Sequence, residues 1–410
     1  MNILLINHYA GSRRLGMEYR PYYLAREWIK TGHRVRIVGA SYSHLRIENP
    51  VLDAGRKKET IDGIDYFWLK TPAYSGNGAM RIVNMLSFIV GLYRHRREIL
   101  RDYMPDVVIA SSTYPLDIFP ARTMARQCSA ILVYEVHDLW PLSPMELGGY
   151  STWNPYIMAI QAAEDYAYRY CDKVVSLLPC AEPHMRSRGL AEGKFHHIPN
   201  GIDASECLSD CGEMPPGHQM AIAAAKVGGR KLVCYAGSHG LANALDAYLD
   251  AAKWVSKAGL VFLLVGNGPE KARLEARIAA EGIVNAISLP AVRKDAMPAL
   301  LAEMDILYIG LQRQSLFRFG ISPNKIMDYM MAGKPVIQAI EAGNDPTTEA
   351  GCGISVPAED ARAIAEAAVK LAEMSDKERR RIGAQGREYV ARLHDYRVVA
   401  KRFIEVLNKE

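Results

Sequence analysis

The sequence predicts an α/β protein with a parallel sheet in each of its two halves. Short apolar runs of strand length alternate with amphipathic helical segments along nearly the whole chain. A stretch rich in Gly, Pro, Ser and Cys, residues 204–229, interrupts this alternation, and a second series of strands follows it. Because 410 residues are too many for one hydrophobic core, we expect at least two domains.

Composition and charge exclude several classes of protein. About half of the residues are apolar (49%), and the net charge of +5 is mild, with no basic stripe typical of a nucleic-acid binder. The first strand has no basic region before it, so we expect no signal peptide and a cytoplasmic protein. The seven cysteines lack the paired spacing of a zinc site, and we expect no metal or redox role for Cys207 and Cys211.

The first half begins with a βαβ unit. A helix with apolar spacing through Tyr23, Leu24 and Trp28 joins the first two predicted strands. Strands are predicted at residues 3–6, 35–38, 64–69, 106–110, 131–135 and 173–178. A glycine-containing loop, residues 8–16, leaves the carboxyl end of the first strand, where open α/β sheets bind ligands.

Gly16 is the candidate phosphate contact in this loop. The loop does not have the GxGxxG pattern of a nicotinamide dinucleotide site. Gly16 would let a phosphate approach the backbone closely, although an ordinary turn glycine explains it nearly as well. Arg13, Arg14 and Arg20 add positive charge around the loop.

His137 and Asp138 follow the strand at residues 131–135. In a parallel sheet they emerge on the same edge as the loop that contains Gly16. A histidine at this position is either a functional group or a structural residue with its hydrogen bonds satisfied, and the sequence leaves both interpretations open.

The segment at residues 79–103 allows two interpretations. Residues 82–93 are almost wholly apolar, and Arg94, Arg96 and Arg97 follow at once. One interpretation is a core helix with a charged end. The other is an interfacial segment whose apolar part enters a bilayer surface while its arginines meet anionic lipid.

The second half repeats the alternation of strands and helices. Glycines follow three of its strands, within residues 236–240, 266–269 and at Gly310, so one anion-binding crevice at a shared sheet edge is expected. Strands are predicted at residues 231–235, 260–265, 286–289, 305–309 and 336–340, and helices at 361–374, from 375–378 onward, and at 396–407.

The stretch at residues 317–336 has the strongest predicted chemistry. Ser322 is the expected N-cap of a short helix, with Pro323 as its first residue. Free backbone N–H groups, the helix dipole and the Lys325 ammonium then attract a phosphate. Asp328, three residues later on the same face, can accept hydrogen bonds from sugar hydroxyls. The alternative is an ordinary capped helix with a solvated Lys–Asp pair.

Several motifs together resemble the retaining GT-B glycosyltransferases of glycosyltransferase family 4, the "glycosyl transferases group 1" family. The motifs are GHRV at 32–35, VHD at 136–138, IPNGID at 198–203, YAGS at 235–238, VGNGP at 265–269, MDI at 304–306 and DYMMAGKPV at 328–336. The resemblance implies two Rossmann-like domains facing across a cleft. It places an acceptor domain at residues 1–200, a nucleotide-sugar domain at 230–390 and a final helix, 391–410, that crosses back to the first domain.

The resemblance also implies roles for individual residues. Gly237 and Lys325 would bind the diphosphate. Asp328 would bind the ribose hydroxyls, and His137 would contact the donor sugar. The remaining implied nucleotide contacts are Pro290, Ala291 and Val292 at the base, Ser322 and Asn324 at the helix start, and Gly16 at the diphosphate. Gly320 stands eight residues before Asp328, where the family usually has a glutamate. Residues 241–244, after the Gly237 loop, lack the usual basic residue.

By this resemblance the protein is a retaining glycosyltransferase. It would move an N-acetylhexosamine-type sugar from a UDP-sugar to a lipid-linked or oligosaccharide acceptor in bacterial surface polysaccharide biosynthesis. Since the sequence has no Asp-x-Asp pair, we expect no metal and no cofactor. Polyprenyl-diphosphate-linked acceptors imply a peripheral site on the inner face of the cytoplasmic membrane, contacted through residues 79–103.

Two other classes of function remain open. A GT-B epimerase acting on a UDP-sugar would share the fold, but the sequence offers no clear pair of carboxylates as acid and base. A catalytically silent partner subunit of a polysaccharide-assembly complex would keep the fold and the interfacial helix. Slow hydrolysis of a donor would indicate the transferase. Interconversion of UDP-sugars would indicate the epimerase, and a lack of donor binding would indicate the silent subunit.

Overall fold

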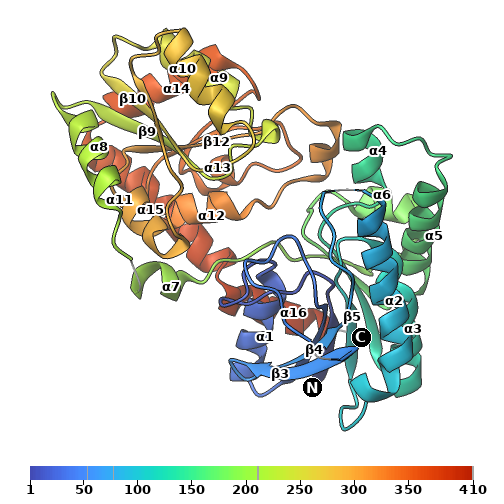
Figure 1. The fold of residues 1–410 in the computed structure, drawn as a ribbon. Helices are drawn as coiled ribbons and strands as arrows, with labels where there is room; N and C mark the ends of the chain where they lie inside the picture. Colours follow the sequence, from blue (N-terminus) through green and yellow to red (C-terminus); the bar gives the residue numbers. More distant parts are fainter. Residues whose placement is uncertain (53, 77, 210–211, 409–410) are drawn as a thin grey trace. The chain divides into compact units, whose positions relative to one another are not determined.

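The computed structural model describes residues 1–52, 54–76, 78–209 and 212–408 (Figure 1). Cys211 lies outside these residues, and the side chain of Cys207 is not described. The chain divides into two compact units. The first contains Met1–Asn200, Phe319–Ser322 and the residues from Tyr396 onward, and the second contains Gly201–Arg318 and Pro323–Asp395.

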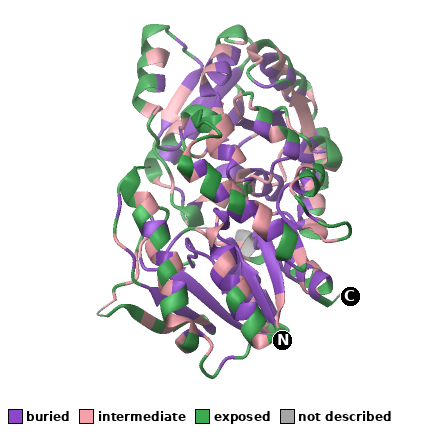
Figure 2. Cartoon of the chain, turned by 90° about the vertical axis from the view of Figure 1, so that its right-hand side faces the viewer, coloured by how far each residue is buried: buried purple, intermediate pink, exposed green. Residues whose placement is uncertain are grey.

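An eight-stranded sheet forms the centre of the first unit, in the order β3-β4-β2-β1-β5-β6-β7-β8. All neighbours are parallel except the antiparallel pair β3 and β4. The strands are β1 (Asn2–Ile6), β2 (Arg34–Ala40), β3 (Arg56–Ile61), β4 (Ile64–Leu69), β5 (Val107–Ala110), β6 (Ile131–Val136), β7 (Lys173–Ser176) and β8 (Phe195–His197). Ile3, Leu4, Leu5 and Ile6 are fully buried because β1 is a central strand of the sheet. Buried stretches of the chain are purple in Figure 2.

Helices cover this sheet, and the last helix of the chain belongs to the same unit. The helices are α1 (Arg20–Lys30), α2 (Ala79–Ile99), α3 (Ile118–Cys128), α4 (Leu142–Gly148), α5 (Pro155–Tyr170), α6 (Glu182–Ser187) and α16 (Tyr396–Asn408). The ring of Tyr396 stacks on that of Tyr23 with centroids 4.8 Å apart. The indole of Trp28 donates a 3.0 Å hydrogen bond to the Ala400 carbonyl. These contacts fix α16 against α1.

The second unit contains a six-stranded parallel sheet in the order β11-β10-β9-β12-β13-β14. Its strands are β9 (Lys231–Ala236), β10 (Leu260–Val265), β11 (Ala286–Leu289), β12 (Ile306–Gly310), β13 (Val336–Ala339) and β14 (Gly353–Val356). Its helices are α7 (Ala204–Ser209), α8 (Pro216–Lys226), α9 (Leu245–Trp254), α10 (Lys271–Ala280), α11 (Met297–Ala302), α12 (Asn324–Met331), α13 (Pro346–Ala350), α14 (Ala361–Glu373) and α15 (Asp376–Leu393).

The structure confirms the predicted α/β architecture and most of the predicted strands. Three strands are absent from the prediction: β3, β8 and β14. All three lie at sheet edges, and none of them has a fully buried residue. Half-exposed edge strands do not need a continuous apolar run, so their sequences give a weak signal. Residues 204–229, expected to be a linker, contain α7 and α8.

The structure confirms the start of α15 that the sequence predicts. Ser375 and Glu378 form the predicted start of α15, since the Ser375 side chain accepts from the Glu378 N–H and the Glu378 side chain accepts from the Ser375 N–H. In the described part of the chain, no helix combines the length and apolarity needed to cross a membrane.

Candidate functional site

Two loops at the carboxyl edge of the second sheet lie backbone against backbone. The N–H of Gly237, after β9, donates to the carbonyl of Val265, and the N–H of His239 donates to that of Asn267, after β10. A Cβ on Gly266 would lie 1.8 Å from the Gly237 oxygen, and one on Gly268 would lie 2.4 Å from the His239 oxygen. Glycine at 266 and 268 therefore allows the two loops to meet.

The start of α12 differs from its prediction. The helix begins at Asn324, and its N-cap is Pro323, which is extended (ψ 128°) and provides no side-chain cap. The predicted capping role of Ser322 is wrong, because its hydroxyl instead accepts a 2.9 Å hydrogen bond from the backbone N–H of Asn200. The Asn200 amide also donates to the Ser322 carbonyl, and both residues belong to the first unit.

Lys325 lies against the loop that follows β9. Its ammonium donates to the Tyr235 hydroxyl at 2.7 Å and lies 4.0 Å from the centre of that ring. A Cβ on Gly237 would lie 2.6 Å from Lys325 Cε, so a larger residue there would displace the end of this side chain. Burial lowers the pKa of Lys325 to about 8, although the Asp328 carboxylate raises it. The structure thus brings together the two residues expected to serve a diphosphate, and Lys325 remains largely charged at pH 7.

Asp328 lies one turn further along α12. Burial raises the pKa of its carboxyl group to about 6, while Lys294 and Lys325 lower it. Among the described residues, neither an ion pair nor a hydrogen-bond donor reaches this carboxylate, so the solvated Lys–Asp pair is not formed. A half-buried carboxylate without protein donors can accept hydrogen bonds from the hydroxyls of a ligand.

The residues expected at a nucleotide base follow β11. Pro290 and Ala291 are exposed, and Val292 is half-buried. The Nε2 atom of His218, from α8, lies 2.9 Å from the carbonyl oxygen of Pro290. No sequence signal points to His218, since it lies in the stretch expected to be a linker. Asn324 is exposed in the first turn of α12.

In the first unit, His137 ends a buried hydrogen-bond network. Its Nε2 lies 3.0 Å from the Ser111 hydroxyl, which donates to Glu135 Oε2 at 2.5 Å. Burial alone would lower the pKa of His137, but the Glu135 carboxylate more than offsets this, and the pKa lies above its ordinary value. His137 is therefore an imidazole whose ring is fixed by Ser111 and whose pKa is raised by Glu135.

Arg20 holds the other side of the Glu135 carboxylate. Its Nε donates to Glu135 Oε1 at 3.0 Å, and its two terminal nitrogens donate to the carbonyls of Ile198 and Pro199. Burial raises the pKa of Glu135, yet Arg20, His137 and Ser111 bring it down to about 2. Arg20 is only 1% exposed, so the expectation that it adds charge around the Gly16 loop is wrong. It is an interior ion-pair residue.

Gly16 has a packing reason to be glycine. Its φ is +95°, and a Cβ there would lie 2.8 Å from the Ile47 nitrogen. The loop also folds tightly on itself, because a Cβ on Gly11 would lie 1.9 Å from the Gly16 oxygen. Gly320 likewise has a φ of +100°, so a left-handed backbone stands where the family usually has a glutamate.

No group of three His, Cys, Asp or Glu side chains among the described residues could hold a metal ion.

Two models of protein families match the chain. Residues 16–201 match a glycosyl transferase 4-like domain, and residues 230–374 match glycosyl transferases group 1. The putative colanic acid biosynthesis glycosyl transferase WcaI of Escherichia coli (strain K12) is 28% identical over 179 residues, which are 43% of this chain and 42% of that protein's length.

Solved structures resemble the whole chain in fold. Anabaena Alr3699/HepE in complex with UDP-glucose is 14% identical with a TM-score of 0.65, covering 99% of both chains. WaaG, a glycosyltransferase involved in lipopolysaccharide biosynthesis, is 15% identical with a TM-score of 0.65, covering 100% of both chains. Sucrose-phosphate synthase from Thermosynechococcus elongatus is 16% identical with a TM-score of 0.68, covering 99% of this chain and 98% of the other.

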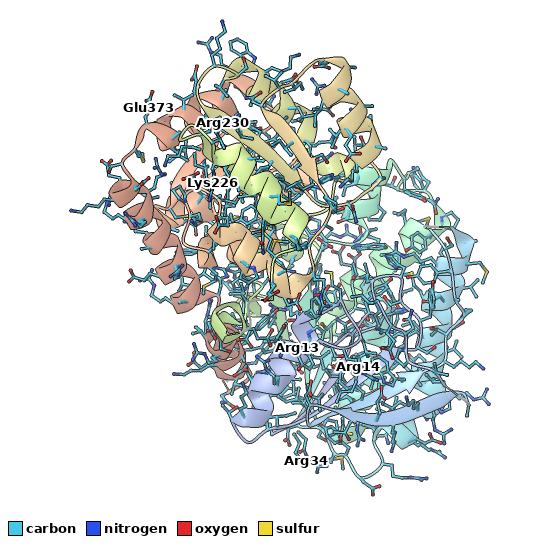
Figure 3. The ribbon with its side chains drawn as sticks, turned by 60° about the vertical axis from the view of Figure 1, so that its left-hand side comes forward. Arg13, Arg14, Arg34, Lys226, Arg230 and Glu373 are labelled. Atoms are coloured by element: carbon cyan, nitrogen blue, oxygen red, sulfur yellow. The ribbon has the colours of Figure 1, made fainter. Side chains whose placement is uncertain are left out.

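Replacing Arg20 with alanine tests the buried network. The change leaves the Glu135 carboxylate buried and unpaired, so we expect a loss of about 3–5 kcal/mol in the free energy of unfolding, measured by urea titration. Arg14→Ala is the control, because Arg14 is 55% exposed and its contacts with Glu48 and Glu59 are 3.7–3.8 Å long (Figure 3). Its loss is expected to stay under about 1 kcal/mol. Equal losses in the two variants would contradict the buried ion pair.

Proposed function

Because the chain belongs to the glycosyl transferases group 1 family and has a GT-B fold, we propose that it is a retaining glycosyltransferase with a UDP-sugar donor. The contact of the Lys325 ammonium with the Gly237 loop, at the start of α12, carries this proposal. The Anabaena HepE complex with UDP-glucose supports the choice of a UDP-linked donor.

The proposed pathway and acceptor are inferred from two proteins that this chain resembles. WcaI is described as a putative colanic acid biosynthesis enzyme, and WaaG as an enzyme of lipopolysaccharide biosynthesis. We therefore propose a role in surface polysaccharide biosynthesis. The transferred sugar is proposed to be of the N-acetylhexosamine type and the acceptor to be lipid-linked or an oligosaccharide.

The proposed chemistry follows from the charge of the leaving group. Breaking the anomeric bond leaves a nucleoside diphosphate with additional negative charge. Lys325 and the N-terminal N–H groups of α12 would stabilise that charge, without a metal ion, because they are fixed and partly removed from water. Asp328 would accept the ribose hydroxyls, and the backbone of Ala291 and Val292 would contact the base.

His137 is proposed to contact the transferred sugar. The Ser111 contact fixes its ring and the Glu135 carboxylate raises its pKa, and an imidazole N–H can donate a hydrogen bond to a sugar hydroxyl. No carboxylate is proposed as a nucleophile. We propose front-face transfer, in which the departing phosphate removes the proton from the acceptor hydroxyl and the anomeric configuration is retained.

The first unit is proposed to contact the inner face of the cytoplasmic membrane through residues 79–103. Several apolar side chains of α2 are open to solvent: Met80 is 49% exposed, Leu86 49% and Val90 63%. Arg94 and Arg97 are also exposed near the end of the helix. Apolar side chains beside arginines are typical of segments that lie in a membrane interface.

Kinetics of Lys325→Ala test the proposed role of α12. The change removes a charge-assisted contact worth roughly 1.5–3 kcal/mol in the ground state, and the contact strengthens as the leaving group gains charge. We expect turnover to fall at least about 10²-fold, with a smaller loss of donor affinity. Asp328→Asn is the comparison: it weakens nucleotide binding and largely spares turnover. Near-wild-type turnover of a normally folded Lys325→Ala protein would remove α12 from the active site.

Chelation tests the proposed absence of a metal ion from the mechanism. Since Lys325 and the start of α12 are proposed to neutralise the leaving group, activity is expected to persist in excess EDTA. The assay compares initial rates before and after EDTA treatment, and after addition of Mg²⁺ or Mn²⁺. Loss of turnover that either cation restores would show that a metal ion performs this role.

Charge reversal tests the proposed membrane contact. Each arginine near an anionic bilayer is worth about 1 kcal/mol, so the triple variant Arg94→Glu, Arg96→Glu and Arg97→Glu is expected to lose flotation with anionic liposomes. Neutral liposomes are the control for the electrostatic part of the attraction. If wild type and variant float equally, residues 79–103 do not dock the protein.

A further inference from the structure

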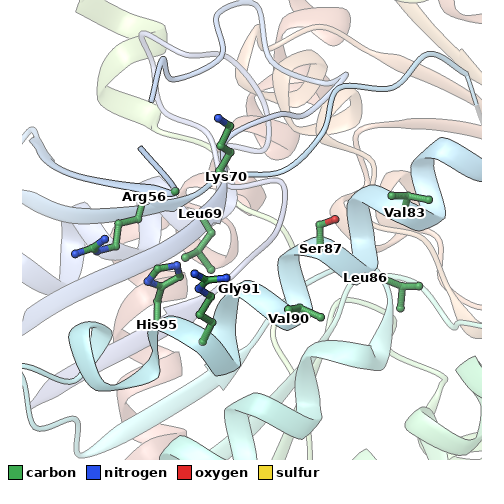
Figure 4. A pocket seen from close by; sticks show the side chains of 11 residues that line it. Arg56, Leu69, Lys70, Val83, Leu86, Ser87, Val90, Gly91 and His95 are labelled. Carbon is green, nitrogen blue, oxygen red and sulfur yellow. The ribbon is translucent and has the colours of Figure 1, made fainter. Parts of the chain in front are cut away.

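A pocket of about 220 Å³ lies in the second unit, at the amino edge of its sheet. It is distinct from a pocket of about 640 Å³ beside α2, which is lined by Leu86 and Val90 of the proposed membrane contact (Figure 4). Three neighbouring strands, β9, β12 and β13, begin beside the smaller pocket, and the first turn of α15 completes it. Since β9 has six residues and spans roughly 20 Å, this amino-edge pocket is remote from the Gly237 loop at the carboxyl edge.

Cationic side chains outnumber carboxylates in the amino-edge pocket. Its charged lining consists of four cationic side chains and two carboxylates: Lys231, Lys334, Arg379, Arg380, Asp305 and Asp376. The Lys231 ammonium lies 3.5 Å from the Asp305 carboxylate and 3.2 Å from that of Asp376. The guanidinium of Arg379, which is 5% exposed, also pairs with Asp376. Lys231 and Arg379 therefore compensate both carboxylates.

The remaining two cations are Lys334 and Arg380, which contact backbone carbonyls only. The Lys334 ammonium donates to the carbonyl of Ala302 at 2.6 Å, and Arg380 Nε donates to that of Asp376 at 3.2 Å. Within the part of the chain that the structure describes, neither side chain forms an ion pair. Burial lowers the pKa of Lys334, which shows that its ammonium is incompletely solvated. The pocket thus has two positive charges that an anion can neutralise.

Close packing fixes the two elements that carry these cations. Lys334 lies in the turn between α12 and β13, and Arg380 lies in α15. A Cβ on Gly383 of α15 would lie 1.9 Å from the Gly333 oxygen, so the helix backbone meets the turn directly. Arg387, further along α15, donates to the Met331 carbonyl at 3.0 Å. The helix and the turn therefore hold the two cationic side chains at one rigid site.

We propose that the amino-edge pocket binds a small phosphate-type dianion between the Lys334 ammonium and the Arg380 guanidinium. Lysine and arginine donate charge-assisted hydrogen bonds to phosphate oxygens, and two positive charges match a dianion. The volume of about 220 Å³ admits inorganic phosphate but is smaller than the roughly 300–1,000 Å³ usual for sites of larger organic ligands. This site goes beyond the proposed function, because the proposed donor contacts of Lys325 lie at the opposite edge of the sheet.

Titration with inorganic phosphate tests the amino-edge site. The rise in melting temperature is followed at constant ionic strength, with chloride as the balancing anion, and is expected to saturate. Lys334→Gln and Arg380→Gln each remove one charge-assisted contact and are expected to raise the apparent dissociation constant at least tenfold. Arg381→Gln is the matched control, because Arg381 is an exposed residue of the same helix outside the pocket lining. It is expected to behave like wild type.

Lys325→Ala separates the amino-edge site from the donor site. The phosphate-dependent rise is expected to persist in this variant, and also in wild type saturated with UDP. Loss of the rise under either condition would place the phosphate at the donor loops and overturn the amino-edge site. A rise that does not saturate, or equal affinity of wild type and the two glutamine variants of Lys334 and Arg380, would also overturn it. UDP binding by wild type reports separately on the proposed donor site, so either proposal can fail without the other.

Discussion

The placement of the Lys325 ammonium is the interaction on which the proposed chemistry depends. A lysine in the first turn of a helix would ordinarily extend into water. Here the Tyr235 ring and hydroxyl hold it, and Gly237 leaves the space that its last carbon occupies. Burial lowers its pKa to about 8, so the charge is kept at neutral pH but is poorly solvated. A cation in that state gains more from an anion than a fully hydrated one does.

The sequence predicts this arrangement in outline because chain topology brings its parts together. Parallel strands place their carboxyl ends on one edge, so a glycine loop after β9 and a helix start before β13 are expected to be neighbours. The strands themselves are predictable because buried parallel strands are continuous apolar runs. Edge strands such as β3, with the sequence RKKETI, carry no such signal.

Details that depend on contacts between distant residues could not be predicted. Ser322 fits an N-cap by its type and position, but its hydroxyl is taken by Asn200, which is distant in the sequence. Arg20 resembles a surface arginine beside a phosphate loop, yet it pairs with Glu135 inside the first unit. In both cases the side chain has several suitable partners, and only the folded chain selects one.

The pH dependence of UDP affinity tests the central claim about Lys325 most directly. As the pH rises through about 8 the free ammonium loses its proton, so affinity measured by calorimetry from pH 7 to 9 is expected to fall above pH 8. Lys325→Arg keeps its charge over this range and is expected to show a flat profile. Parallel profiles for wild type and Lys325→Arg would show that the Lys325 charge does not hold the diphosphate.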